Sequence, residues 1–187
     1  MSSEATSAPR SGASAGDGAM FEFFNETHRR VHEELRRLNR VVDDLVQDRL
    51  QPAGMARLKD ILHWFDTAAR EHHVDEEKHV FPALLAIGDE RVTRMTRRLL
   101  QDHAWIDDNW QALKPLLLAV AGGNPRGEPV RLQELAHLFT ELYMEHMGVE
   151  ESMAYPKLRS RMTPAAVAAA EREMTQRRKV RRDRQAR

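Results

Sequence analysis

The stretch Glu71-His72-His73-Val74-Asp75-Glu76-Glu77 decides the fold, because the chain repeats its pattern 74 positions later as EHMGVEE over residues 145–151. In both copies a histidine and a glutamate stand four residues apart, at His72 and Glu76 and at His146 and Glu150. His73 and Glu77 are a rival pair in the first copy, but the second copy has Met147 at the matching position, which favours His72 and Glu76. Residues at i and i+4 lie on one face of an α-helix, so each copy presents one imidazole and one carboxylate in the same direction. Two such helices facing each other would form a metal site.

Each copy lies within a longer helical pattern. Four segments carry apolar residues at alternating steps of three and four, which predicts four amphipathic helices with one core-facing stripe each. The ligand-type residues continue these stripes: His28 lies on the first, His72 and Glu76 on the second, His103 on the third, and His146 and Glu150 on the fourth. The second stripe includes Ala68 and the fourth ends at Met153.

Four long helices with short connections predict an all-α fold, an antiparallel up-down-up-down four-helix bundle over residues 20–160. Residues 1–19 are rich in Ser, Ala and Gly and predict a disordered tail. Thr163-Pro164 predicts the start of a short fifth helix in a basic C-terminal segment, 161–187. Residues 171–187 hold eight Lys and Arg against three Asp and Glu. We interpret this tail as solvated, with a contact to nucleic acid, an acidic partner or a membrane surface as the alternative.

Composition excludes several kinds of site. The chain has no cysteine, so any metal must be held by histidine and carboxylate. Its 29 basic and 29 acidic residues balance, which does not indicate a nucleic-acid-binding protein. No apolar run approaches the length of a membrane span, and the N-terminus lacks the pattern of a signal peptide. We therefore expect a cytoplasmic protein.

The spacing of the histidines supports a twofold arrangement. His28 precedes His72 by 44 residues, and His103 precedes His146 by 43. Two similar helical hairpins would bring four His and two Glu together inside the bundle. Burying two carboxylates costs several kcal/mol each unless a positive charge compensates them, and the stripes offer no Lys or Arg. We predict two ions bridged by Glu76 and Glu150, with iron favoured, manganese second, and zinc less economical.

These residues resemble the hemerythrin-like family, also called the HHE cation-binding domain. The resemblance covers roughly residues 20–160 and rests on His28, HHVDEEKHVFP (72–82), His103 and HMGVEESMAYP (146–156). It implies a left-handed antiparallel bundle around a non-haem di-iron centre with an oxo or hydroxo bridge. Members of this family bind O2 reversibly, or sense or handle O2, nitric oxide, peroxide or iron. The resemblance implies terminal ligands at His28, His72, His103 and His146, and bridging carboxylates at Glu76 and Glu150.

The chain departs from the oxygen-carrying members, which have two histidines four apart on the third helix. Here that helix has His103 with Asp107, whereas the first helix has His28 and His32 four apart. His32 is therefore a candidate fifth imidazole, which would leave an open position on the ion held by His103 and His146. The alternative is a symmetric site with four histidines and His32 behind them. We expect Asp107 to lie behind the ligands or to face solvent.

The function expected from this site is binding or sensing of a small ligand. An enzyme that reduces nitric oxide or peroxide is the alternative, and so is a metal-responsive interaction module that uses the basic tail. No obvious general acid or substrate pocket occurs on the stripes, and Tyr143, one turn before His146, is the candidate phenol close in sequence. The sequence does not choose between a monomer and a homodimer.

Overall fold

The computed structural model describes residues 19–124 and 128–185. The disordered tail expected at 1–19 therefore lies outside the described residues, apart from Ala19. All regular structure in the described part is helical, which confirms the all-α prediction. In the same part of the chain, no helix has the length and apolar character needed to cross a membrane.

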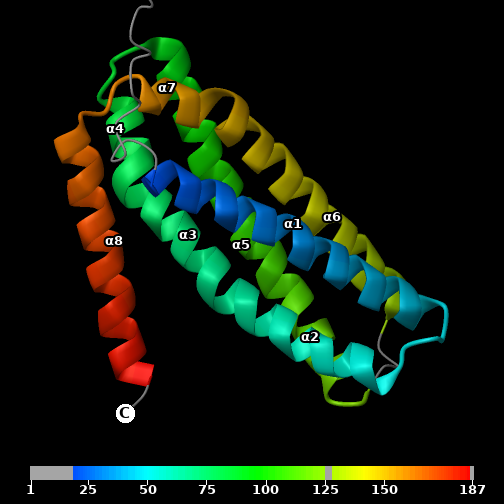
Figure 1. Ribbon diagram of the computed structural model, residues 1–187. Helices are drawn as coiled ribbons and strands as arrows, with labels where there is room; N and C mark the ends of the chain where they lie inside the picture. Colours follow the sequence, from blue (N-terminus) through cyan, green and yellow to red (C-terminus); the bar gives the residue numbers. More distant parts are fainter. Residues whose placement is uncertain (1–18, 125–127, 186–187) are drawn as a thin grey trace, which may run out of the picture.

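Four helical segments form the bundle. They are α1 (Ala19–Val46), a second segment that begins with α2 (Pro52–Trp64), the 32-residue α5 (Glu90–Ala121), and α6 (Pro129–Val149). Each segment packs against the next one in the chain, and α6 closes the ring by packing against α1. Figure 1 shows the four segments side by side, with the C-terminal helix α8 outside them.

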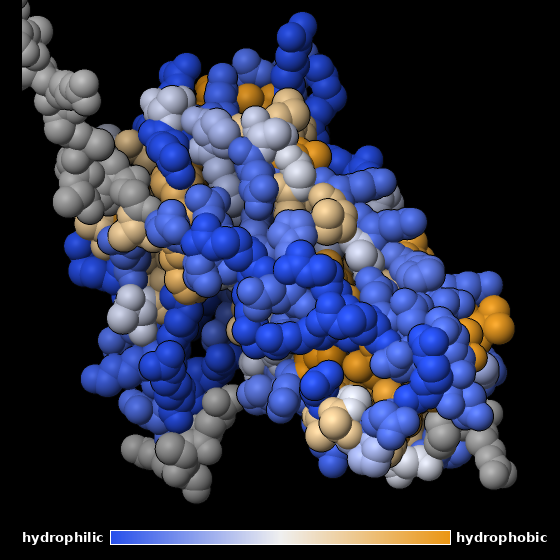
Figure 2. Space-filling model, turned by 45° about the vertical axis from the view of Figure 1, so that its right-hand side comes forward, coloured by the Kyte–Doolittle hydropathy of each residue, from blue (hydrophilic) through white to orange (hydrophobic). Residues whose placement is uncertain are grey.

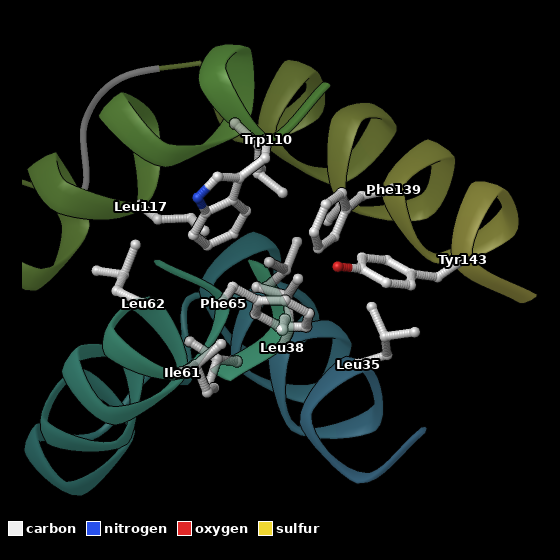
Figure 3. Packing of buried hydrophobic residues seen from close by; sticks show 14 of the residues in the cluster. Leu35, Leu38, Ile61, Leu62, Phe65, Trp110, Leu117, Phe139 and Tyr143 are labelled. Atoms are coloured by element: carbon white, nitrogen blue, oxygen red, sulfur yellow. The ribbon is translucent and has the colours of Figure 1, made fainter. Parts of the chain in front are cut away.

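Two apolar clusters fill the bundle, one on each side of the repeated motif. The larger cluster is built around Phe65, whose ring lies 5.0 Å from that of Phe139, 5.2 Å from Trp110 and 5.8 Å from Tyr143 (Figure 3). The smaller cluster contains the start of α1 and the residues that follow each motif, including Phe81 and Tyr155. The first and third segments begin in the smaller cluster and end in the larger one, whereas the second and fourth begin in the larger cluster and end in the smaller one. Consecutive segments therefore run in opposite directions.

The second and fourth segments contain wide π-helical turns, at η1 (Phe65–Ala69), η2 (Glu76–Val80) and η3 (Glu150–Ala154). Short α-helical pieces, α3 (Arg70–Asp75), α4 (Phe81–Leu85) and α7 (Tyr155–Arg159), continue the segments. The backbone N–H of Phe81 donates to the carbonyl of Glu76, five residues back, and Tyr155 does the same to Glu150. Pro82 and Pro156 follow directly; proline lacks an N–H and its ring clashes with the carbonyl four residues earlier, which a wider turn relieves.

The wide turns change which residues face the core. Each turn holds one more residue than an α-helical turn, so the buried face moves on by one position. Ala69 is buried where the stripe predicts Ala68, and Ala154 is buried where it predicts Met153, which is 57% exposed. Those two stripe assignments were wrong, because they assumed an uninterrupted α-helix.

The C-terminal helix α8 (Pro164–Gln185) is 22 residues long, so the expectation of a short fifth helix was wrong in length. It starts where predicted, with the hydroxyl of Thr163 accepting a hydrogen bond from the N–H of Ala166. Its apolar residues Val167, Ala170 and Met174 are buried in the smaller cluster. In Figure 1 its N-terminal half lies against the bundle, and its C-terminal half diverges from it.

Arginines of α8 contact the acidic residues of the first motif copy. Arg177 and Arg178 each form an ion pair with one carboxylate oxygen of Asp75, which is fully buried, and Arg181 lies 2.7 Å from Glu71. The guanidinium of Arg178 also lies 4.2 Å from the ring centroid of Phe23. The basic segment is thus an ordered helix fastened to the bundle, and our interpretation of it as a solvated tail was wrong for this part.

Candidate metal centre

Six of the seven sequence-predicted ligands meet in the middle of the bundle. His28 comes from α1, His72 from α3, His103 from α5 and His146 from α6, whereas Glu76 and Glu150 each open a π-helical turn. All six side chains are at most 5% exposed. Two overlapping groups have ligand atoms within 4.8 Å of one another: His28, His72, Glu76 and Glu150, and Glu76, His103, His146 and Glu150. The two carboxylates belong to both groups.

The imidazoles are paired within each hairpin. The Nε2 atoms of His28 and His72 lie 2.9 Å apart, and those of His103 and His146 lie 3.1 Å apart. Each of these nitrogens also lies 3.2–3.5 Å from a carboxylate oxygen of Glu76 or Glu150. Such separations are typical of atoms that each lie about 2.1 Å from a common ion.

The second glutamate of each motif copy holds a histidine of the other hairpin. Glu77 accepts from Nδ1 of His103 at 2.9 Å, and Glu151 accepts from Nδ1 of His28 at 2.8 Å. A carboxylate at Nδ1 keeps the proton there and leaves the Nε2 lone pair free for a metal. The sequence shows this glutamate in both copies, but only the fold shows that it reaches across to the other half.

The two buried glutamates of the cluster differ in pKa. Burial and the neighbouring charge of Glu150 raise the pKa of Glu76 to about 7. Burial also acts to raise the pKa of Glu150, but His146 and His28 outweigh it and hold that pKa well below its usual range. Burial lowers the pKa of His72 far below its ordinary value, which keeps it in the neutral form that binds metals. For His103 burial acts in the same direction, yet Glu76 and Glu77 raise its pKa to about 9.

Several polar atoms of the cluster have no hydrogen-bond partner within the described residues. They are Oε2 of Glu76, both carboxylate oxygens of Glu150, Nδ1 of His72 and of His146, and Nε2 of His73, all of them buried. Buried polar atoms are nearly always hydrogen-bonded, and buried carboxylates without compensation are costly. A cation between the carboxylates and imidazoles would satisfy the carboxylate oxygens, so these residues fit a metal.

The structure places His73, and not His32, beside the six clustered residues. His32 is only partly buried and belongs to none of the ligand groups found in the described residues. His73 instead forms a third group with His103 and His146, and its ring stacks on that of His103 with 3.9 Å between centroids. The turn η1 precedes this segment and adds one residue to it, so that both His72 and His73 are buried.

Tyr155 is a further polar residue of the site that the spacing did not reveal. Its hydroxyl donates a short hydrogen bond to Oε1 of Glu76 and lies 3.2 Å from Nε2 of His28. The phenol is 3% exposed, and burial next to the carboxylates raises its pKa well above the usual value. The corresponding residue of the first copy is Phe81, which packs against His103 without a hydroxyl. The two halves of the site therefore differ: one has a phenol, the other a third imidazole.

A small cavity of about 30 Å³ lies beside His73. Phe65, Ile106, Phe139 and Tyr143 form much of its wall, so Tyr143 borders the cavity while Tyr155 contacts the carboxylates. Asp107 lines the cavity too, but is exposed and accepts a hydrogen bond from Gln111 at 3.4 Å. This volume is sufficient for one molecule the size of water or a diatomic gas.

Comparison with known proteins agrees with this geometry. Residues 19–158 match the sequence profile of the Hemerythrin HHE cation binding domain. A Haemophilus influenzae protein described as uncharacterized is 27% identical over 132 residues, which are 71% of this chain and 74% of that protein. Because the profile spans the helices that carry all six clustered residues, the chain belongs to the hemerythrin HHE cation-binding family.

Proposed function

We propose that this protein is a non-haem di-iron protein that binds or senses a small ligand such as O2. The observation that carries the proposal is the pair of overlapping groups that share Glu76 and Glu150. Two shared carboxylates with imidazoles on either side are the donor set expected for two neighbouring ions. Mixed nitrogen and oxygen donors suit iron, with manganese or zinc as less favoured occupants.

In this proposal the two ions have unequal surroundings. One would be held by His28 and His72, and the other by His103, His146 and His73, with Glu76 and Glu150 common to both. His73 takes the place that the sequence gave to His32. The ion with fewer imidazoles, beside Tyr155, then has the position for an added ligand, opposite to the expectation from the sequence.

The chain's own residues determine what the centre can do. With iron bound by these residues, the site would have one electron per ion available, which is the chemistry that reversible binding of O2, or its reduction, requires. The small volume of the cavity beside His73 limits it to small molecules, and polar residues such as Asp107 form its outer part. The hydroxyl of Tyr155 donates its one proton to Glu76 and so holds a carboxylate that both groups share. None of these features provides room for a larger substrate.

A second candidate function is an enzyme that reduces nitric oxide or peroxide at the same centre. Tyr155 favours it, because its hydroxyl is hydrogen-bonded to Glu76, whose pKa of about 7 suits the proton transfer that turnover would require. Steady consumption of nitric oxide or peroxide in the presence of a reductant, reduced in Tyr155→Phe, would select this function. Stoichiometric binding without turnover would select the carrier or sensor.

The test of the main proposal is iron content together with the optical spectrum of the aerobic protein. We expect about two irons per chain, near-ultraviolet bands of a bridged ferric pair, and shifts of these bands when azide is added. His146→Ala should remove the bands, and His73→Ala should alter them. His32→Ala is the matched control, since this histidine lies outside the cluster, and should leave content and spectrum unchanged.

Two results would contradict the proposal. One is a chain that binds no metal after reconstitution, which would make the cluster a purely structural feature. The other is a spectrum altered by His32→Ala but not by His73→Ala, which would restore the ligand set expected from the sequence.

A further inference from the structure

Away from the metal centre, unneutralised positive charge gathers in the cleft between α8 and the segment from η1 to α3. We propose that this cleft is a binding site for a small multivalent oxyanion attached to an apolar body, such as a phosphate ester or a polycarboxylate. The site concerns the outer surface of the bundle and does not depend on the identity of the bound metal.

The cleft is a defined space with a mixed lining. Its volume is about 380 Å³, within the range of small-molecule sites. Four arginines line it: Arg70 from the bundle, and Arg177, Arg181 and Arg184 from α8. Val74 and Val180 contribute apolar surface. Figure 2 shows a hollow between the strongly hydrophilic lower end of α8 and the body of the molecule.

The carboxylates of the cleft already have hydrogen-bond or ion-pair partners. Asp66 accepts hydrogen bonds from the indole of Trp110 and from Lys114, both at 2.9 Å. Glu71 pairs with Arg181 at 2.7 Å. Arg177 is bound by Asp75 and Glu173. The acidic groups therefore do not neutralise the remaining arginines.

Two guanidinium groups are left with donors to spare. Arg70 and Arg184 are exposed and have no carboxylate within 4.0 Å among the described residues. An unpaired guanidinium keeps all its N–H groups available for an oxyanion. The hollow space of about 380 Å³, with an arginine of this kind on each wall, distinguishes this cleft from a flat, solvated basic face.

The chemistry of the lining selects the ligand class. A guanidinium presents its N–H groups as a planar fork that matches two oxygens of a phosphate or carboxylate. Arginines on both walls favour a ligand with more than one negative charge, and the two valines favour an apolar portion beside it. A long nucleic acid would also engage Arg172 and Lys179, which are exposed on α8 outside the cleft lining.

The experiment is a titration of the metal-loaded full chain with inorganic pyrophosphate and, separately, with citrate, by calorimetry at constant ionic strength. We expect saturable binding of at least one of them with one site per chain. Arg70→Gln/Arg184→Gln should weaken it at least about tenfold, since each lost charge-assisted contact corresponds to roughly that factor. Both arginines are exposed, so the variant should keep the wild-type helix content and melting temperature.

Arg172→Gln/Lys179→Gln is the matched control, because it also removes two positive charges, but from parts of α8 outside the cleft. It should change the affinity by no more than about twofold through the screened field. Preference for pyrophosphate would indicate a phosphate ester as the ligand, and preference for citrate a polycarboxylate. Equal losses in the two variants, binding of single-stranded DNA alone, or no saturable binding at millimolar concentration would each overturn the proposal.

Discussion

Single hydrogen bonds make the two hairpins of this bundle depend on each other. Glu77 and Glu151 are about half exposed, at 45% and 47%, yet each binds Nδ1 of a buried histidine that belongs to the other hairpin. An acceptor at Nδ1 fixes the tautomer and the orientation of the ring whose Nε2 faces the cluster. Residues that touch no metal thus decide whether the ligands are ready for one.

We predict that Glu77→Gln and Glu151→Gln each weaken metal affinity about 10-fold to 100-fold, the usual effect of removing the acceptor behind a metal-binding histidine. Competition with a chromogenic chelator measures this change. Glu145→Gln is the matched control, because Glu145 precedes His146 in the motif but is 74% exposed, with its carboxylate 3.9 Å from the guanidinium of Arg98. Equal affinities for all three variants would contradict the role given to Glu77 and Glu151.

At the scale of helices, the sequence predicted the segments well and their phase only in part. The repeat and the apolar stripes place six of the clustered residues, because an α-helical period holds locally around each motif. The turn η1 breaks this period without proline or glycine in Phe65–Ala69, so the sequence does not mark the shift that brings His73 to the cluster as well as His72. The turns η2 and η3 do have a signal, the aromatic-proline pair that follows each motif.

The length of α8 and its packing against the bundle could likewise not be predicted from the sequence. Its arginines look like a solvated basic run, since their partners Asp75 and Glu71 are about 100 residues earlier in the chain. The pairing makes the last helix part of the wall that supports the first motif.

We predict that Arg177→Gln/Arg178→Gln lowers the free energy of unfolding by about 3–5 kcal/mol, because it leaves Asp75 buried without a counter-charge. Adding Asp75→Asn to this variant should recover part of the loss by removing the buried charge. Urea unfolding followed by circular dichroism measures both effects. A triple variant as unstable as the double variant would show that lost packing, not the unpaired carboxylate, causes the loss.

The contact between α8 and α3–η2 also predicts a pH dependence. The hydrogen bond from Arg177 holds the pKa of Glu173 at about 2, with a further contribution from His79 and against an opposing effect of burial. A carboxyl whose pKa is lower in the folded state stabilises the fold above its unfolded value near 4.5, and this contribution is lost as the pH falls towards 2. The difference in free energy of unfolding between wild type and Glu173→Gln should shrink over that window in acid unfolding experiments. A constant difference would exclude the interaction.

For the whole molecule, the metal centre lies between the two apolar clusters and joins all four helices of the bundle. Metal that binds only the folded chain stabilises it by about 4 kcal/mol at a free concentration 1,000 times its Kd. We therefore expect dialysis against a chelator to lower the melting temperature, and His146→Ala to reduce this difference. Identical melting curves with and without metal would mean that the buried cluster is satisfied without an ion.

The crossed contacts of Glu77 and Glu151 also bear on how such a chain can arise. Each hairpin supplies half of the ligand-type residues and the glutamate that orients a histidine of the other half. A single hairpin could therefore complete such a cluster only by pairing with a second copy of itself. A gene duplication that fused two such copies would preserve every crossed contact. Fusion would also allow the halves to differ, as Tyr155 differs from Phe81 and His73 from Met147. A single chain can therefore place a phenol on one side of the cluster and a third imidazole on the other, which a symmetric pair of identical hairpins could not do.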